Sequence, residues 1–264
     1  MRNGAIRAAL TAFLAFSVAL GTAYAQNNSG TQPATSGDKS SKGGEKTVEE
    51  AYLQESAEAV MVKELSHADD RDGKLLALDY ARKSLDAGRK NEEIRNSLQY
   101  LALENTEVIA RSAGLGATTN NFPDVRKTAC EYLGEFPSQE SKDTLVKVIS
   151  NSKTEDPMVL CEAIRSLGKI GINDNDEVVD AISYSVNHYD KVGMSEDRLA
   201  VYTMMAFSDL ADQGKIKDIS TVTQTVMNFT KGNYVGSVKR MAMATLEKLA
   251  AYQAKNSNTT SGTK

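Results

Sequence analysis

Apolar residues recur three and four positions apart through residues 48–254, for example at Ile94, Leu98 and Leu101. This spacing is the period of a helix that buries one face. Runs that alternate every second residue, which would predict strands, are missing from this stretch. Helix start signals recur along it, at Thr47 with Glu50, Asn91, Asp156 before Pro157, Asp174 with Glu177, and Ser195. The pattern predicts an all-α fold of many short helices.

One segment of this helical stretch is repeated. Residues 123–136 superimpose without gaps on residues 157–170, so that proline falls on proline and Leu133 falls on Leu167. Weaker copies with the same apolar frame lie near Ile94, Asp197 and Val238. Between the copies, second helices with their own apolar stripes are predicted at 138–150, 176–189 and 218–230. The two strong copies are offset by 34 residues, from 123 to 157. A repeat of this length is typical of stacked helix pairs.

The two strong copies resemble the HEAT-repeat family, whose units typically read Asp-Pro-x-Val-Arg-x-x-Ala-x-x-x-Leu-Gly-x-x-Gly. Residues 121–134 and 156–171 carry the match, although Leu160 stands where the family usually has arginine, and Ala206 and Glu247 replace the glycine. The resemblance implies an α-solenoid of antiparallel helix pairs, with about four to five units over residues 48–254. It places the motif on the first helix of each pair, and it implies a binding or scaffolding role without conserved chemistry.

The first 25 residues read as an export signal. They have a basic start with Arg2 and Arg7, an apolar run over about 8–20, and Ala-Tyr-Ala before Gln26. Cleavage is predicted after Ala25, which places the protein in the periplasm or outside the cell. A retained membrane anchor is the alternative, but the apolar run is shorter than the ~20 residues that span a bilayer. The mature form is therefore expected to have no membrane span.

Two segments have the composition of flexible chain. Residues 26–47 and 255–264 are rich in Ser, Gly, Thr and Asn and carry little apolar surface to bury. The sequence predicts a disordered tether before the solenoid and a disordered tail after it. A tether of this kind would give an exported binding protein reach.

Composition limits the partners and the chemistry. The chain has 31 basic and 35 acidic side chains and a net charge of −4, which argues against nucleic acid as a partner. Its two histidines, His67 and His188, lack a neighbour at metal-ligand spacing, so no metal, no cofactor and no catalytic residue are predicted. Asp70, Asp72 and Gly73 resemble part of a calcium loop, but ligands at its first and last positions are missing, which favours a helix-capping turn.

The two cysteines lie on helices of adjacent repeats. Export would permit a disulfide between Cys130 and Cys161. Stacked helix axes are 8 to 10 Å apart, however, and a disulfide needs Cα atoms within about 7 Å. Buried free thiols are therefore favoured over a disulfide.

The second helices offer a candidate binding surface. In 176–189, the apolar residues cluster on one side by helical angle, whereas Tyr184 and His188 fall opposite them. Alignment of the neighbouring second helices extends this row to four polar residues: Lys147, Asn151, Gln224 and Asn228. The row is predicted to be a partner-binding stripe with Tyr184 as its anchor. An ordinary polar surface is the alternative interpretation.

These features lead to one leading function and two alternatives. The leading hypothesis is a non-enzymatic exported scaffold or adaptor that binds a protein or peptide on the solenoid surface. The first alternative is a structural subunit of a cell-envelope assembly, joined to copies or other subunits through the solenoid ends. The more distant alternative is a lyase-type HEAT-like enzyme. Partner identity and oligomeric state do not follow from the sequence.

Overall fold

The computed structural model describes residues 48–106, 119–152, 155–189 and 196–261, and in these ranges the chain is all-α. The described residues form ten helices: α1 (Val48–Ser66), α2 (Arg71–Asp86), α3 (Glu92–Leu103), α4 (Pro123–Leu133), α5 (Gln139–Ser150), α6 (Pro157–Ile170), α7 (Glu177–Asn187), α8 (Asp197–Asp212), α9 (Ile219–Lys231) and α10 (Gly236–Ser261). Residues from Lys46 onward form one unit. The predicted signal peptide and tether lie outside the described residues.

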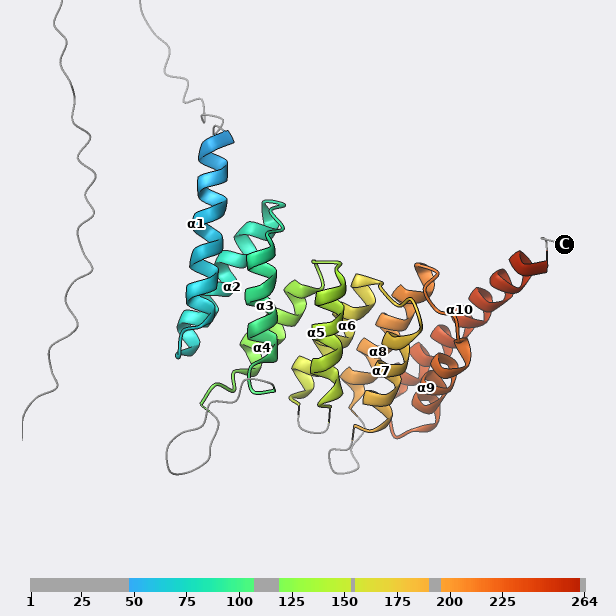
Figure 1. Cartoon of the computed structure of the whole chain (residues 1–264). Helices are drawn as coiled ribbons and strands as arrows, with labels where there is room; N and C mark the ends of the chain where they lie inside the picture. Colours follow the sequence, from blue (N-terminus) through green and yellow to red (C-terminus); the bar gives the residue numbers. More distant parts are fainter. Residues whose placement is uncertain (1–47, 107–118, 153–154, 190–195, 262–264) are drawn as a thin grey trace, which may run out of the picture. The chain divides into compact units, whose positions relative to one another are not determined.

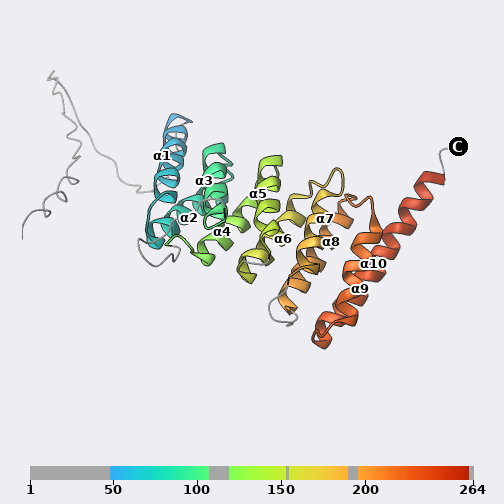
Figure 2. The ribbon, with the colours of Figure 1, turned by 60° about the horizontal axis from the view of Figure 1, so that its bottom comes forward.

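The helices are arranged in two rows. The odd-numbered helices α1, α3, α5, α7 and α9 follow one another in one row, and the even-numbered helices form the other (Figure 1). Each odd helix packs along the even helix that comes after it, and only slightly against the one before it. The described residues therefore form five stacked helix pairs, from α1/α2 to α9/α10. The same two rows are seen from another side in Figure 2. This confirms the predicted stack of helix pairs.

The pairing differs from the prediction in its phase. The sequence placed the helix that begins at Pro123 in one unit with the helix after it, whereas α4 packs along α3, and α5 packs along α6. The HEAT-like motif therefore lies on the second helix of each pair. The predicted motif copy at Ile94 is also wrong, because α3 belongs to the odd row. Both rows have the same apolar period, so spacing alone did not distinguish them.

Side-chain caps define the starts of five of the described helices. The side chains of Asp70, Asn91, Ser138, Asp156 and Asp218 each accept a hydrogen bond from a backbone N–H in the first turn. Asn91 and Asp156 were predicted in this role, and Asp70 forms the helix-capping turn that was favoured over a calcium loop. The predicted start at Asp174 is two residues early, since Asp176 is the N-cap of α7. Thr47 and Ser195 lie outside the described residues.

A continuous apolar core lies between the two rows. Val125, Ala129 and Leu133 of α4 are fully buried in it, which confirms the apolar frame of the strong repeat copies. Successive even helices approach closely, because a Cβ on Gly168 would lie 2.6 Å from the Cα of Ala206 in α8. Small residues at the crossing permit this separation.

The end of the chain differs from its prediction. A disordered tail was predicted from residue 255, whereas α10 continues to Ser261. The last turns of α10 therefore extend a helix that begins in the core. Among the described residues, no helix is both long enough and apolar enough to cross a membrane.

Candidate interaction surface

The six predicted partner-binding residues lie on three neighbouring helices of the odd row. We call them the odd-helix ridge: Lys147 and Asn151 of α5, Tyr184 and His188 of α7, and Gln224 and Asn228 of α9. α5 packs beside α7, and α7 packs beside α9. All six side chains are exposed. The structure thus places them along one surface, as the helical angles predicted, while their role in binding stays a prediction.

Tyr184 and His188 form a stacked aromatic pair at the centre of the odd-helix ridge. Their ring centroids are 4.1 Å apart and the rings are inclined by 25°. His188 Nδ1 lies 2.8 Å from the backbone oxygen of Tyr184, which holds the imidazole in place. Tyr184 remains 58% exposed, whereas Val178, Val179 and Ile182 of the same helix are fully buried. The aromatic surface is therefore ordered and open to solvent.

An amide network connects the α7 and α9 parts of the odd-helix ridge. Asn228 donates from Nδ2 to Oδ1 of Asn187 at 3.3 Å, and Gln224 donates from Nε2 to Oδ1 of Asn228 at the same distance. Asn187 also donates to the hydroxyl of Thr225 at 3.5 Å. Asn187 was not among the predicted residues, although its position three residues after Tyr184, on the same side of the helix, was a signal. The network joins the last turn of α7 to α9.

In the α5 part of the odd-helix ridge, Asn151 forms a hydrogen bond with the end of its own helix. Asn151 is the C-cap of α5 and donates from Nδ2 to the backbone oxygen of Lys147 at 3.3 Å. This bond satisfies one of the carbonyl groups that a helix end leaves without an intrahelical partner. Lys147 lies in the last turn, where its charge is favourable to the helix dipole. Both residues therefore have a structural role beside any contact with a partner.

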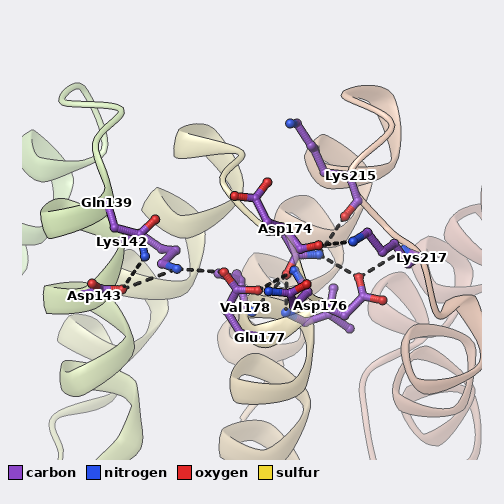
Figure 3. Close-up of polar contacts among 12 residues, drawn as sticks. Gln139, Lys142, Asp143, Asp174, Asp176, Glu177, Val178, Lys215 and Lys217 are labelled. Carbon is purple, nitrogen blue, oxygen red and sulfur yellow. Dashed lines mark hydrogen bonds and ion pairs between the residues drawn. The ribbon is translucent and has the colours of Figure 1, made fainter.

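The opposite ends of the same helices are joined by ion pairs and hydrogen bonds. Lys142 of α5 donates from Nζ to Oε1 of Glu177 in α7 at 2.7 Å (Figure 3). The Lys142 side chain is only 6% exposed. Burial pushes the pKa of Glu177 upward, but the Lys142 hydrogen bond and the backbone amides of Asn175 and Glu177 together lower it to about 2. This edge holds adjacent repeats in register.

Asp176 connects this edge to the next repeat. Its carboxylate accepts hydrogen bonds from Asn173 Nδ2 at 2.9 Å and from the backbone N–H groups of Lys217 at 3.0 Å and Asp218 at 2.6 Å. The residue has a φ of +59°, which aspartate tolerates better than most residues. Asp176 therefore bridges the start of α7 and the segment that leads into α9 (Figure 3). The carboxylates of Asp176 and Glu177 are thus engaged within the protein, whereas Asp174 and Asp180 are exposed.

The two cysteines lie inside the protein. Cys130 and Cys161 are both free and buried, which confirms the predicted free thiols. Burial raises the pKa of Cys130 well above its usual range and that of Cys161 to about 12. Among the described residues, no group of three or more His, Cys, Asp and Glu side chains is placed to hold a metal ion.

Comparison with known proteins identifies the repeats. A family model described as HEAT repeats matches residues 112–188. The match covers α4 to α7 and includes both strong copies of the motif. No curated protein matches the chain.

Proposed function

Because residues 112–188 are a HEAT-repeat region, and because HEAT-repeat helical proteins are typically protein-interaction scaffolds, we propose that this protein is an exported, non-enzymatic scaffold or adaptor. In this proposal it binds a protein or peptide partner along the odd-helix ridge. The net charge of −4 supports a protein partner over a nucleic acid. The inaccessible thiols of Cys130 and Cys161 support a non-enzymatic role, because a thiol nucleophile must be exposed and ionised.

The stacked Tyr184–His188 pair is the observation that carries the proposal. Tyrosine is enriched among the residues that dominate binding energy, since it buries a large area with few rotatable bonds. Stacking on His188 restricts the Tyr184 ring before any partner arrives. Binding then costs less side-chain entropy than it would with a mobile ring. The odd-helix ridge thus offers an ordered aromatic anchor with amide and lysine side chains around it.

A photo-crosslinking experiment tests the ridge directly. A photoreactive amino acid placed at Gln224 is compared in the parent chain and in the Tyr184→Ala/His188→Ala variant, expressed in the cells that normally produce the protein. We expect a crosslinked partner with the parent and a loss of that product with the variant. A probe at Met158, which is 40% exposed on α6 and off the ridge, is the matched control.

The stability of the double variant decides how the result is read. Tyr184 and His188 lie outside the core, so the free energy of unfolding should change by no more than about 0.5 kcal/mol per site. Equal crosslinking with and without the two aromatic side chains would remove the odd-helix ridge as the binding surface. Unfolding of the variant would show that the two side chains support the fold.

Export is tested at the N-terminus, which lies outside the described residues. Mass spectrometry of the protein from its native cells should find chains that begin at Gln26. An intact Met1 on protein extracted from membranes would contradict export and restore the anchor interpretation.

A further inference from the structure

The exposed large apolar side chains are concentrated at the two ends of the stack. Six of the eight in the described part of the chain lie on α1, α2 or α10 or directly before α10: Leu53, Val60, Met61, Leu76, Val235 and Met243. The other two are Met158 and Tyr184. Exposed apolar groups gathered in this way mark interaction surfaces more often than scattered ones.

α1 shows the feature most clearly. Its residues Leu53, Val60 and Met61 are 67%, 53% and 43% exposed, and by helical angle they lie opposite the buried Ala59 and Val62. The inner face of α1 packs on α2 and α3. Among the described helices, α1 is the first of the odd row. Each later odd helix buries one face against the odd helix before it, as α3 does against α1. The corresponding face of α1 is the outer, apolar one.

Contacts along the even row show which side chains face which neighbour. In the turn directly after α4, Glu135 accepts a hydrogen bond from Arg82 Nη1 of the preceding even helix at 2.6 Å. A Cβ on the adjacent Gly134 would lie 2.7 Å from Ser166 Oγ of the following even helix. Two consecutive residues near the helix end therefore face opposite neighbours in the row.

The same rule applied to the two end helices identifies a pair of opposite charges. In α2, Arg82 faces the following helix, so Lys83 is on the side where a preceding even helix would lie. In α10, Lys248 Nζ contacts the preceding helix, at Ser208 O (3.3 Å) and at Asp212 (2.6 Å), so Glu247 is on the side of a following one. Lys83 and Glu247 are both exposed.

The surrounding side chains extend this complementarity. On α2, the exposed positions one and two turns before Lys83 are Asp79 and Leu76, with Asp72 beyond them. On α10, the exposed positions one and two turns before Glu247 are Met243 and Arg240. Even helices share one direction, so these series would run side by side. Side chains of packed helices interdigitate, so Glu247 would lie between Lys83 and Asp79. Met243 would then lie between Asp79 and Leu76, and Arg240 between Leu76 and Asp72.

We propose that the two ends bind each other in separate copies of this chain, with α10 of one copy packed against α2 of the next. Glu247 lies beside Lys83 of the second copy, and Met243 lies beside its Leu76. Lys83 is now paired with Asp79 at 2.7 Å, but both side chains are more than half exposed, and a pair of this kind is weak enough to exchange. The contact repeats the stacking of even helices within the chain.

Head-to-tail contact has a consequence for the assembly. The two surfaces differ, so each added copy leaves one free end of either kind and growth does not stop at a dimer. The odd-helix ridge remains exposed in such a stack. The proposal therefore goes beyond partner binding on the ridge. It names contact residues for the alternative function, a structural subunit that assembles through the solenoid ends.

Sedimentation of the full chain over a range of concentrations tests the proposal. We expect the average mass to rise with concentration past that of a dimer, and to fall when salt screens the charges. Met243→Asp should abolish the rise, because it places a like charge beside Asp79 of the next copy. Met158→Asp, which adds the same charge away from both ends, should leave the rise unchanged. The Tyr184→Ala/His188→Ala variant should also associate normally, which separates this test from that of the ridge.

Charge reversal provides the sharpest measurement. Glu247→Lys and Lys83→Glu should each remove association when studied alone, because like charges then meet at the contact. An equimolar mixture of the two variants should associate again, as should the double variant. Unchanged helical circular dichroism shows that both variants are folded.

Three outcomes would overturn the proposal. One is a parent chain that stays monomeric at every concentration, which would leave the ends to a different partner or to another segment of the same chain. Another is a closed dimer that both reversals leave intact. The third is association lost in the single variants and not restored by mixing them.

Discussion

Arg126 donates two hydrogen bonds to Glu155, from Nη1 to Oε1 at 2.7 Å and from Nη2 to Oε2 at 2.5 Å. Both side chains are almost completely buried, at 1% and 2% exposure. Arg126 Nε also donates to the backbone oxygen of Ala102 at 3.3 Å. The ion pair therefore joins α4 to the end of α3 and to the segment that leads into α6.

The same arrangement occurs one repeat earlier. Lys74 of α2 donates from Nζ to Oε1 of Glu104 at 2.7 Å, and both side chains are 2% exposed. Lys74 also donates to the backbone oxygen of Ser66 at 3.1 Å. Lys74 and Arg126 hold the same place near the start of an even helix, so α2 is the repeat copy that the sequence comparison had placed at Ile94.

Breaking the Arg126–Glu155 pair should be costly. Arg126→Met leaves the Glu155 carboxylate buried without its counter-charge, which should lower the free energy of unfolding by about 3–5 kcal/mol. Arg126→Met combined with Glu155→Leu should recover much of this loss, because apolar pairs can replace buried ion pairs. Leu160, buried at the equivalent position of α6, is the natural precedent. Urea unfolding of the single and double variants measures both effects, and equal stability of parent and Arg126→Met would contradict the first.

Close helix packing at Gly168 should make this position intolerant of a side chain. The added methyl group of Gly168→Ala would lie 2.6 Å from the Cα of Ala206, so α6 and α8 must move apart. Overpacking of this kind costs about 1–3 kcal/mol, which thermal unfolding would detect. Gly236→Ala is the control, since only the end of the Arg240 side chain comes near its Cβ, at 3.6 Å. A variant at Gly168 as stable as the parent would mean that the two helices separate freely.

Glu177 should make stability depend on pH in the acid range. Its pKa is about 2 in the folded protein, below the ordinary value of 4.5. A lowered folded pKa stabilises the protein above pH 4.5, and this contribution disappears as the pH falls towards 2. Glu177→Gln should therefore flatten the decrease in unfolding free energy between pH 4.5 and 2. Lys142→Met should flatten it as well, and a parent and a Glu177→Gln variant with parallel profiles would contradict the assignment.

The two thiols should react only after unfolding. Cys130 and Cys161 are buried, and burial raises the pKa of both, so neither forms the reactive thiolate at neutral pH. An alkylating reagent should add nothing to the native chain and two groups to the chain in denaturant. Mass spectrometry counts the additions. Failure of the unfolded chain to react without a reductant would reveal a disulfide.

The sequence by itself determined the local features of this protein. Apolar spacing predicted the helices, Asn91 and Asp156 marked helix starts, and angles within 176–189 placed Tyr184 and His188 on the exposed side of α7. These features depend on residues within one or two turns of each other. The backbone period and the hydrogen-bonding capacity of single side chains are enough to predict them.

Tertiary structure decided which helices are paired and what joins the repeats. Helices α2 to α9 have similar apolar stripes in both rows, so only packing shows that α4 pairs with α3 and that Ile94 lies in the odd row. The Arg126–Glu155 pair and the bridge at Asp176 join residues that are far apart in the sequence, where their charges look like ordinary surface groups. The end faces of α2 and α10 are defined by the neighbours that these helices lack within the described chain. Such relations depend on distances between helices, and no pattern within one helix contains them.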